Sequence, residues 1–231
     1  NGKKYTNPLA VRRTTVVRAA AFKSGMLPSR VETHTYAYNL SKGVTSLPMM
    51  SLVTENSNLW GNTGIMETNP RNTTKRGIAW ERPVSMELIY PDTGETLQAN
   101  AGLRVQGGNY IRGRYNPNAG PPAGKYSFRL YFRGDYGPGR LRHPFFPALQ
   151  VEDFNHIVLR AGMNDNTNPF VIDELVRRLS ADMGQVAARG TFMNLYLNGK
   201  SKGYYNPTER IDSDFLNSWN GGESEWDIIA Q

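Results

Sequence analysis

The stretch that decides the fold is residues 191–215, T-F-M-N-L-Y-L-N-G-K-S-K-G-Y-Y-N-P-T-E-R-I-D-S-D-F. Met193, Leu195 and Leu197 alternate with Phe192, Asn194 and Tyr196. This is the period of a β-strand. Asn198 and Gly199 follow, and this dipeptide best accepts the two positive φ angles of a type I′ hairpin turn. We expect the returning strand over about 200–205, ending before Pro207, because proline has no N–H for the ladder. Taken alone, these residues indicate an ordinary hairpin with a capped turn.

The composition bounds the class of protein. At 231 residues the chain can bury a sizeable core in one large or two small domains. A hydrophobic content of 39% with 23 Gly and 14 Pro is typical of a loop-rich protein with much β structure. No apolar run is long enough to span a bilayer, and without Cys there is no disulfide framework. The chain begins with Asn1 and has no signal peptide, so we expect a processed piece of a longer protein.

The net charge of +7 is unevenly distributed. Residues 1–42 and 101–150 each hold eight basic residues and one acid, whereas residues 209–231 hold six acids and one Arg. A basic stripe can attract phosphate, nucleic acid or an acidic polymer. A solvated face is the simpler interpretation. Because no nucleic-acid-binding motif is present, we expect no specific nucleic acid partner.

Patterning along the rest of the chain predicts strands and one clear helix. The helix begins at the N-cap candidate Asn168 with Pro169 at its first position and ends at Gly184. Its apolar residues at helical spacing are Ile172, Leu175, Val176, Leu179 and Met183. The expected strands are 14–22, 31–36, 49–54, 84–90, 102–108, 125–133 and 156–162. In 125–133, alternation places Phe128, Leu130 and Phe132 on one face and Ser127, Arg129, Tyr131 and Arg133 on the other.

Several motifs carry a family resemblance. The hairpin pattern F-x-x-L-Y-L-N-G-x-x-x-G-x-Y-x-x-x-E-R-I-D-x-x-F over 192–215 resembles the signature of CotH-type proteins, which are secreted or spore-coat atypical protein kinases. W-E-R-P-V at 80–84, G-L-R-V-x-G-G at 102–108 and K-x-S-F-R-L-Y-F at 125–132 resemble further motifs of that family, whereas Ser201-Lys202 departs from its pattern. Residues 1–40 resemble the C-terminal part of a chitobiase/hexosaminidase C-terminal-type module.

These resemblances imply an α+β fold in two parts. Residues 1–40 are expected to form part of a fibronectin III-like β-sandwich, and residues 47–231 a mainly β, kinase-like N-terminal lobe with one clear helix. A polar linker, 39–46, separates the two. The resemblance also implies a secreted or cell-surface protein, for which Asn39 and Asn72 are glycosylation sequons by pattern.

The resemblance also implies candidate residues for ATP binding. Phosphoryl transfer needs a cation on the phosphates and a carboxylate that orients this cation. Lys125, after a Gly-rich loop, is favoured as the cation; the alternatives are Arg104 on the neighbouring strand and Arg129 on the same strand. Glu174 on the helix is the candidate orienting carboxylate, and Glu209 is expected near a hinge. The alternatives for these residues are a solvated basic edge and ordinary surface ion pairs.

No catalytic residue and no metal ligand can be assigned from the sequence. Asp165 resembles a family motif, although a turn-forming Asp is the commoner explanation, and Asp227 resembles the residue before the family's metal-binding acids. We therefore expect this piece alone to be inactive, with ATP and Mg²⁺ bound only by the full-length protein.

Two functions stay open at this point. The first is a portion of a secreted CotH-like kinase that transfers phosphate from ATP to protein. The alternative is a non-catalytic surface or binding protein that holds an acidic polymer or a partner protein on its basic face. The phospho-acceptor and the oligomeric state are not encoded in any pattern that we recognise.

Overall fold

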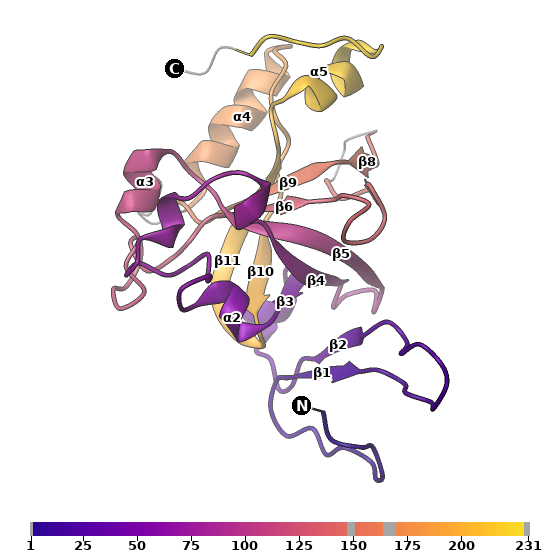
Figure 1. The fold of residues 1–231 in the computed structure, drawn as a ribbon. Helices are drawn as coiled ribbons and strands as arrows, with labels where there is room; N and C mark the ends of the chain where they lie inside the picture. Colours follow the sequence, from indigo (N-terminus) through magenta and orange to yellow (C-terminus); the bar gives the residue numbers. More distant parts are fainter. Residues whose placement is uncertain (1, 147–150, 164–169, 229–231) are drawn as a thin grey trace.

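A closed seven-stranded β-barrel forms the body of the chain (Figure 1). The computed structural model describes residues 2–146, 151–163 and 170–228. Around the barrel the strands follow the order β10-β11-β9-β6-β5-β4-β3. Their bounds are β3 Met49–Val53, β4 Arg82–Ile89, β5 Thr96–Val105, β6 Phe128–Tyr131, β9 His156–Arg160, β10 Met193–Leu197 and β11 Lys200–Glu209.

The C-terminal hairpin closes the barrel. Its strands β10 and β11 are joined by Asn198 (φ 49°) and Gly199 (φ 74°), which confirms the predicted turn with two positive φ angles. β10 pairs in parallel with β3, and β11 pairs antiparallel with β9. The expected end of the returning strand was wrong. β11 continues through Pro207, whose carbonyl oxygen accepts from the Thr191 N–H at 3.0 Å, so the missing proline N–H does not end the strand.

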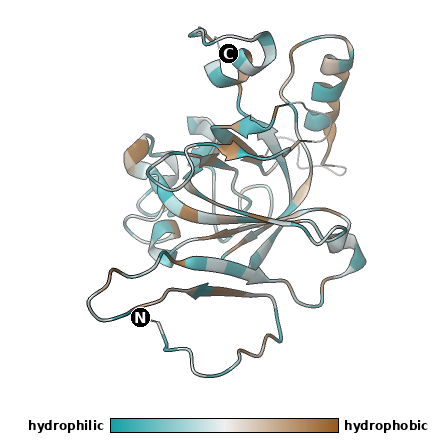
Figure 2. Ribbon diagram, turned by 90° about the vertical axis from the view of Figure 1, so that its right-hand side faces the viewer, coloured by the Kyte–Doolittle hydropathy of each residue, from teal (hydrophilic) through white to brown (hydrophobic). Residues whose placement is uncertain are grey.

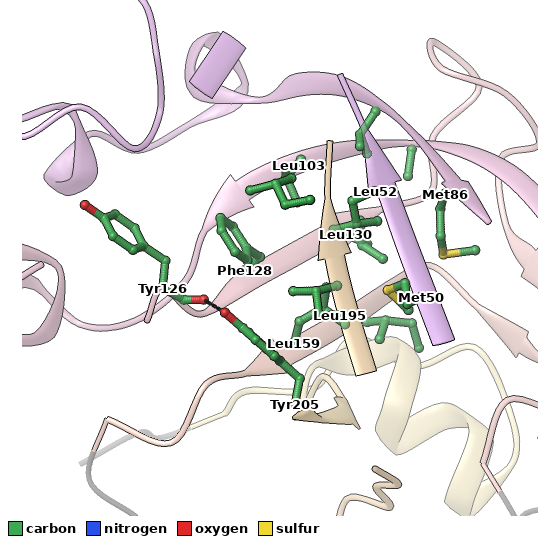
Figure 3. Packing of buried hydrophobic residues seen from close by; sticks show 14 of the residues in the cluster. Met50, Leu52, Met86, Leu103, Tyr126, Phe128, Leu130, Leu159, Leu195 and Tyr205 are labelled. Atoms are coloured by element: carbon green, nitrogen blue, oxygen red, sulfur yellow. Dashed lines mark hydrogen bonds between the residues drawn. The ribbon is translucent and has the colours of Figure 1, made fainter. Parts of the chain in front are cut away.

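The barrel interior is filled by apolar side chains from every strand (Figure 3). In β6, Phe128 and Leu130 are buried in this core, as the alternation predicted. Tyr205 is also buried there, and its hydroxyl donates to the Tyr126 carbonyl oxygen at 2.8 Å. The residues that alternate with these in sequence therefore lie on the outer wall.

The remaining elements lie around the barrel. Two longer helices, α4 Ile172–Asp182 and α5 Ser213–Asn220, lie at one end of the molecule (Figures 1 and 2). The short elements are α1 Lys42–Thr45, α2 Asn56–Leu59, η1 Asn72–Thr74, η2 Ile78–Trp80, α3 Asn109–Gly113, β7 Leu141–Arg142 and β8 Asp153–Phe154. Among the described residues, no helix is long and apolar enough to cross a membrane.

Helix α4 was expected, but its orientation was not. Its buried residue is Glu174, whereas the apolar residues at helical spacing are 52–73% exposed. The polar side of the helix therefore faces the barrel. The predicted cap residues Asn168 and Pro169 lie outside the described residues.

The expected α+β fold, with a partial β-sandwich and a kinase-like lobe containing one helix, is wrong. The described chain is β-rich, with a closed barrel and more than one helix. The reason is the pairing of β3 with β10, which closes the barrel. No local pattern predicts this pairing, because the two strands come from nearly opposite ends of the barrel sequence.

Residues 2–40 contain a two-stranded sheet, β1 Thr15–Ala19 with β2 Glu32–Tyr36, at the end of the barrel away from α4 and α5 (Figures 1 and 2). The Thr35 N–H donates to the buried carboxylate of Glu87 at 2.7 Å, and the Thr35 hydroxyl to Ser51 at 2.7 Å. The division into units 1–40 and 47–231 stays a prediction, which limited proteolysis of the 39–46 linker would test.

Candidate functional site

The outer wall formed by β5, β6, β9 and β11 brings two of the predicted cations together. The strand register places Arg104 opposite Arg129, Arg129 opposite Val158, and Val158 opposite Thr208. These four residues form one row across the wall, because directly opposed residues point to the same face. Arg104 and Arg129 are therefore neighbours on the outer face.

A buried carboxylate, that of Glu81, lies next to Arg104. The side chain of Glu81 is 0% exposed, and its Oε1 accepts from Nε of Arg133 at 3.0 Å. Its Oε2 lies 3.9 Å from Nε of Arg104. Glu81 occupies the space above Gly102, where an added Cβ would lie only 2.6 Å from Glu81 Cγ. The glycine therefore lets a carboxylate reach the arginines on the barrel wall.

Tyr131 is the centre of the cationic cluster. The guanidinium carbon atoms of Arg104, Arg133 and Arg129 lie 4.2, 5.2 and 5.5 Å from its ring centroid, and Arg104 also donates to its hydroxyl. The ring of His156 packs edge-on against Tyr131 at 4.7 Å between centroids. Stacking of this kind orients guanidinium groups without neutralising their charge.

Arg129 is half-buried and is held by a neutral partner. Its Nε donates to Oε1 of Gln106 at 2.9 Å. Burial lowers the pKa of Arg129, and the charges of Arg210 and Arg104 lower it further, while Tyr131 opposes them. An arginine remains charged under such shifts. The row thus carries positive charge with only Glu81 within ion-pair distance among the described residues.

A cavity of about 480 Å³ lies beside this row, between α4 and the barrel wall. One part of its lining is apolar and includes Ile111, Phe170 and Phe192. Another part is polar and includes Gln106 and Ser127. Val158, which stands next to Arg129 in the row, also lines the cavity. A volume of this size suits a small organic ligand.

Glu174 anchors α4 to the rim of the cavity. Its carboxylate accepts from Arg177 Nη2 at 2.6 Å, Arg178 Nε at 2.7 Å and Asn206 Nδ2 at 3.0 Å. Burial alone would raise the pKa of Glu174, but these hydrogen bonds together hold it below its usual value. The expected pair with Arg178 is present, yet Glu174 is buried and connects the helix to β11. Within the described part of the chain, Glu174 forms no hydrogen bond or ion pair with Arg104, Arg129 or Lys125.

Lys125 lies just before β6, and its ammonium group is enclosed by aromatic rings. Nζ donates to the Tyr204 carbonyl oxygen at 2.6 Å and lies 4.7, 5.1 and 4.7 Å from the ring centroids of Phe170, Tyr204 and Tyr205. Burial lowers its pKa to about 8. Phe170 contacts this lysine and also lines the cavity, whereas Lys125 itself does not line it. Lys125 is thus close to the cavity but is not part of the arginine row.

Glu209 lies away from the cavity. One of its carboxylate oxygens accepts from the Arg189 N–H at 2.7 Å. Burial raises the pKa of Glu209 to about 7, although the contacts with Arg189 oppose the shift. Nearby, Asp212 caps α5 by accepting from the Phe215 N–H at 3.1 Å. The structure therefore groups Arg104 with Arg129 and leaves Lys125, Glu174 and Glu209 in separate environments.

The described residues do not form a recognisable magnesium site. In 2–146, 151–163 and 170–228, no three Asp, Glu, His or Cys side chains come together as metal ligands would. Asp227 is exposed, and Asp165 lies outside the described residues. Mg²⁺ prefers several oxygen ligands in octahedral geometry, so the described donor set does not fit it.

Sequence reasoning missed the residues that organise the wall. Glu81 precedes a strand and looked like part of a motif, without any sign that it covers Gly102. Tyr131 was placed on the correct face, but its contact with three arginines depends on β5 and β6 lying side by side. Alternation within 156–160 would have placed Arg160 on the outer face together with His156.

The fold and the wall define a β-barrel protein with a cationic outer face beside a ligand-sized cavity. The CotH kinase protein family matches residues 112–230, a span that covers just over half of the chain. The chain belongs to this family. The match begins in α3 and includes β6 through β11 together with α4 and α5, so it contains most of the cavity lining. No curated protein matches the chain.

Proposed function

We propose that this chain is part of a CotH-like protein kinase that binds ATP in the cavity beside the arginine row and transfers phosphate to protein. The observation that carries the proposal is the pair Arg104 and Arg129 in one row, whose next residue, Val158, lines a cavity of about 480 Å³. Guanidinium groups bind phosphate oxygens through paired, charge-assisted hydrogen bonds. The family match supports the same activity class.

The two parts of the cavity suit the two parts of a nucleotide. A nucleoside base would lie against the apolar side chains, including Phe170 and Phe192, where aromatic rings can stack on it. The phosphates would extend over Val158 toward Arg129, with Arg104 next along the row. Glu81 would keep Arg104 in place by its ion pair.

The chemistry assigned to this chain is electrostatic. ATP supplies the phosphoryl group, and transfer depends mainly on positioning and on neutralising charge at the phosphate oxygens. In this proposal Arg129 and Arg104 provide that neutralisation, and the wall of α4 excludes water from one side of the cavity. Because the described residues do not fit Mg²⁺, no step is assigned to a metal.

The same basic wall supports a second candidate function, a non-catalytic surface protein that holds an anionic partner. We also propose that the protein is secreted or lies at the cell surface. Residues 1–40 would then be part of a chitobiase-type module. ATP binding separates the two functions, because a purely structural surface has no need for a nucleoside pocket.

The test is nucleotide binding by titration calorimetry with ATP and AMP. Arg129→Gln should weaken ATP binding about 10- to 100-fold, because a hydrogen bond to a charged group contributes roughly 1.5–3 kcal/mol. AMP has fewer phosphates, and the variant should affect it less. Arg30→Gln is the control, since Arg30 is an exposed arginine in the loop between β1 and β2. Equal loss of ATP and AMP, or equal loss in the control, would contradict the proposal.

A further inference from the structure

A basic surface lies next to the arginine row, and its cations are not used by the proposed nucleotide site. It is formed where residues 71–76, around η1, meet residues 109–114, around α3. The Thr73 hydroxyl donates to the Arg112 carbonyl oxygen at 2.8 Å, and Arg112 Nη1 donates to the Lys75 carbonyl oxygen at 3.0 Å. The cations of this η1–α3 patch are Arg71, Lys75, Arg76, Arg112 and Arg114.

No carboxylate in the described part of the chain pairs with the η1–α3 patch. None of its five cations forms an ion pair with any residue that the structure describes. Their acceptors are neutral: Arg71 donates to the Gly113 carbonyl oxygen, and Arg76 Nη2 donates to Asn109 Oδ1 at 2.7 Å. Arg114 donates to the Tyr110 hydroxyl. Within the described residues, the patch therefore carries positive charge that no carboxylate pairs with.

Arg112 is the residue that points most directly to a missing anion. It is only 5% exposed, and its buried Nε has no hydrogen-bond partner among the described residues. Burial lowers the pKa of Arg112, and the charges of Arg76 and Arg104 lower it further. A buried charge without a counter-ion is costly, and the cost falls when an anion pairs with it. An anion bound to the exposed cations next to Arg112 would lower this cost through its charge, without contacting the buried Nε.

We propose that the η1–α3 patch binds acidic side chains of a polypeptide, namely those that flank the phosphate-accepting residue of a protein substrate. The identity of the partner as a kinase substrate rests on the proposed function. The binding of acidic side chains rests only on the charge of the surface. The segment after β5 connects the two sites, because Gln106 accepts from Arg129 at 2.9 Å and the space beside Gly107 is filled by Ile111 and by Arg112 Cγ. Acidic residues held by the patch would therefore lie beside the nucleotide phosphates.

The surface fits an acidic polypeptide better than a nucleic acid. Its one prominent aromatic ring, Tyr110, is 71% exposed but is engaged by the Arg114 guanidinium at 4.8 Å, so it is not a free platform for base stacking. The guanidinium fork matches a carboxylate as a bidentate partner. Ile78, directly beyond Arg76 and Gly77, is 62% exposed and offers an apolar contact that a peptide side chain can use.

The test is fluorescence anisotropy with a labelled peptide of Asp, Glu, Ser and Gly, compared with the same peptide in which Asn and Gln replace the acids. The double variant Arg76→Gln/Arg114→Gln should weaken binding of the acidic peptide about ten-fold, because two exposed charge contacts are lost. The control Arg12→Gln/Arg30→Gln removes the same charge from exposed residues of the N-terminal region and should change binding less than about two-fold.

Several results would overturn the inference. One is that the neutral peptide binds as well as the acidic one. Another is that the control loses as much affinity as the patch variant. A third is that single-stranded DNA binds the patch more tightly than the acidic peptide. ATP binding by Arg76→Gln/Arg114→Gln separates the two proposals, because it should match that of the unchanged protein. If ATP does not bind but the patch still selects the acidic peptide, the kinase proposal fails and the docking surface stands.

Discussion

Replacing Gly102 with alanine should destabilise the protein, because the Glu81 carboxylate occupies the space of the new methyl group. The added Cβ would lie 2.6 Å from each of three atoms, Glu81 Cγ, Glu81 Oε1 and Tyr136 Cε2. Normal contacts between such atoms are about 3.5–4.0 Å, so these groups must move by about 1 Å. Glu81 is 0% exposed and is tied to Arg133, which leaves it little freedom to move.

The expected loss for Gly102→Ala is about 3 kcal/mol, from overpacking and from a weakened buried ion pair. For a chain of this size, that corresponds to a melting temperature lower by roughly 6–12 °C. Urea and thermal unfolding followed by circular dichroism would measure both. Gly134→Ala is the matched control, since nothing lies within 4 Å of its added Cβ, and it should cost less than about 0.5 kcal/mol.

A double-mutant cycle identifies Glu81 as the cause. In a Glu81→Ala background the alanine at 102 has fewer atoms to displace, so its cost should be smaller by at least about 1 kcal/mol. Two outcomes would refute the reasoning: Gly102→Ala behaving like Gly134→Ala, or the effects of the 81 and 102 substitutions simply adding.

Two further predictions concern buried charges. Burial raises the pKa of Glu209 from 4.5 to about 7, so the folded state binds more protons than the unfolded state. The free energy of unfolding should therefore fall as the pH rises from about 5 to 7. Glu209→Gln should flatten this pH dependence in urea unfolding at several pH values, and an unchanged slope would count against it. Arg177→Met should cost about 3 kcal/mol, because it leaves the buried Glu174 with one partner fewer. Arg178→Met, at a side chain that is 57% exposed, should cost less than about 1 kcal/mol in the same unfolding assay, and equal costs would contradict the assignment.

The sequence was informative where structure depends on neighbours along the chain. The turn at Asn198 and Gly199 follows from backbone preference, and the two faces of β6 follow from alternation. Alternation also placed Arg129 and Tyr131 on the same face, which is the outer wall.

What could not be predicted depends on which strands become neighbours. The register of β5 with β6 sets Arg104 beside Arg129, and neither strand encodes that register by itself. The three rings around Lys125 come from two distant segments, so its aromatic enclosure was invisible before folding. The inward polar face of α4 also contradicts the usual rule that an apolar stripe faces the core, because Glu174 finds its partners on the helix and on β11.

The parallel pairing of β3 with β10 has a consequence for biosynthesis. β3 ends at Val53, yet its partner begins only at Met193, so a ribosome must make most of the chain before the barrel can close. Contacts between such distant segments slow folding, because a long loop has to be closed before they form. Until then β3 and β9 each present an open edge that can pair with another nascent chain. Synthesis at high local concentration should therefore favour aggregation, and a slower supply of chains should favour the closed barrel.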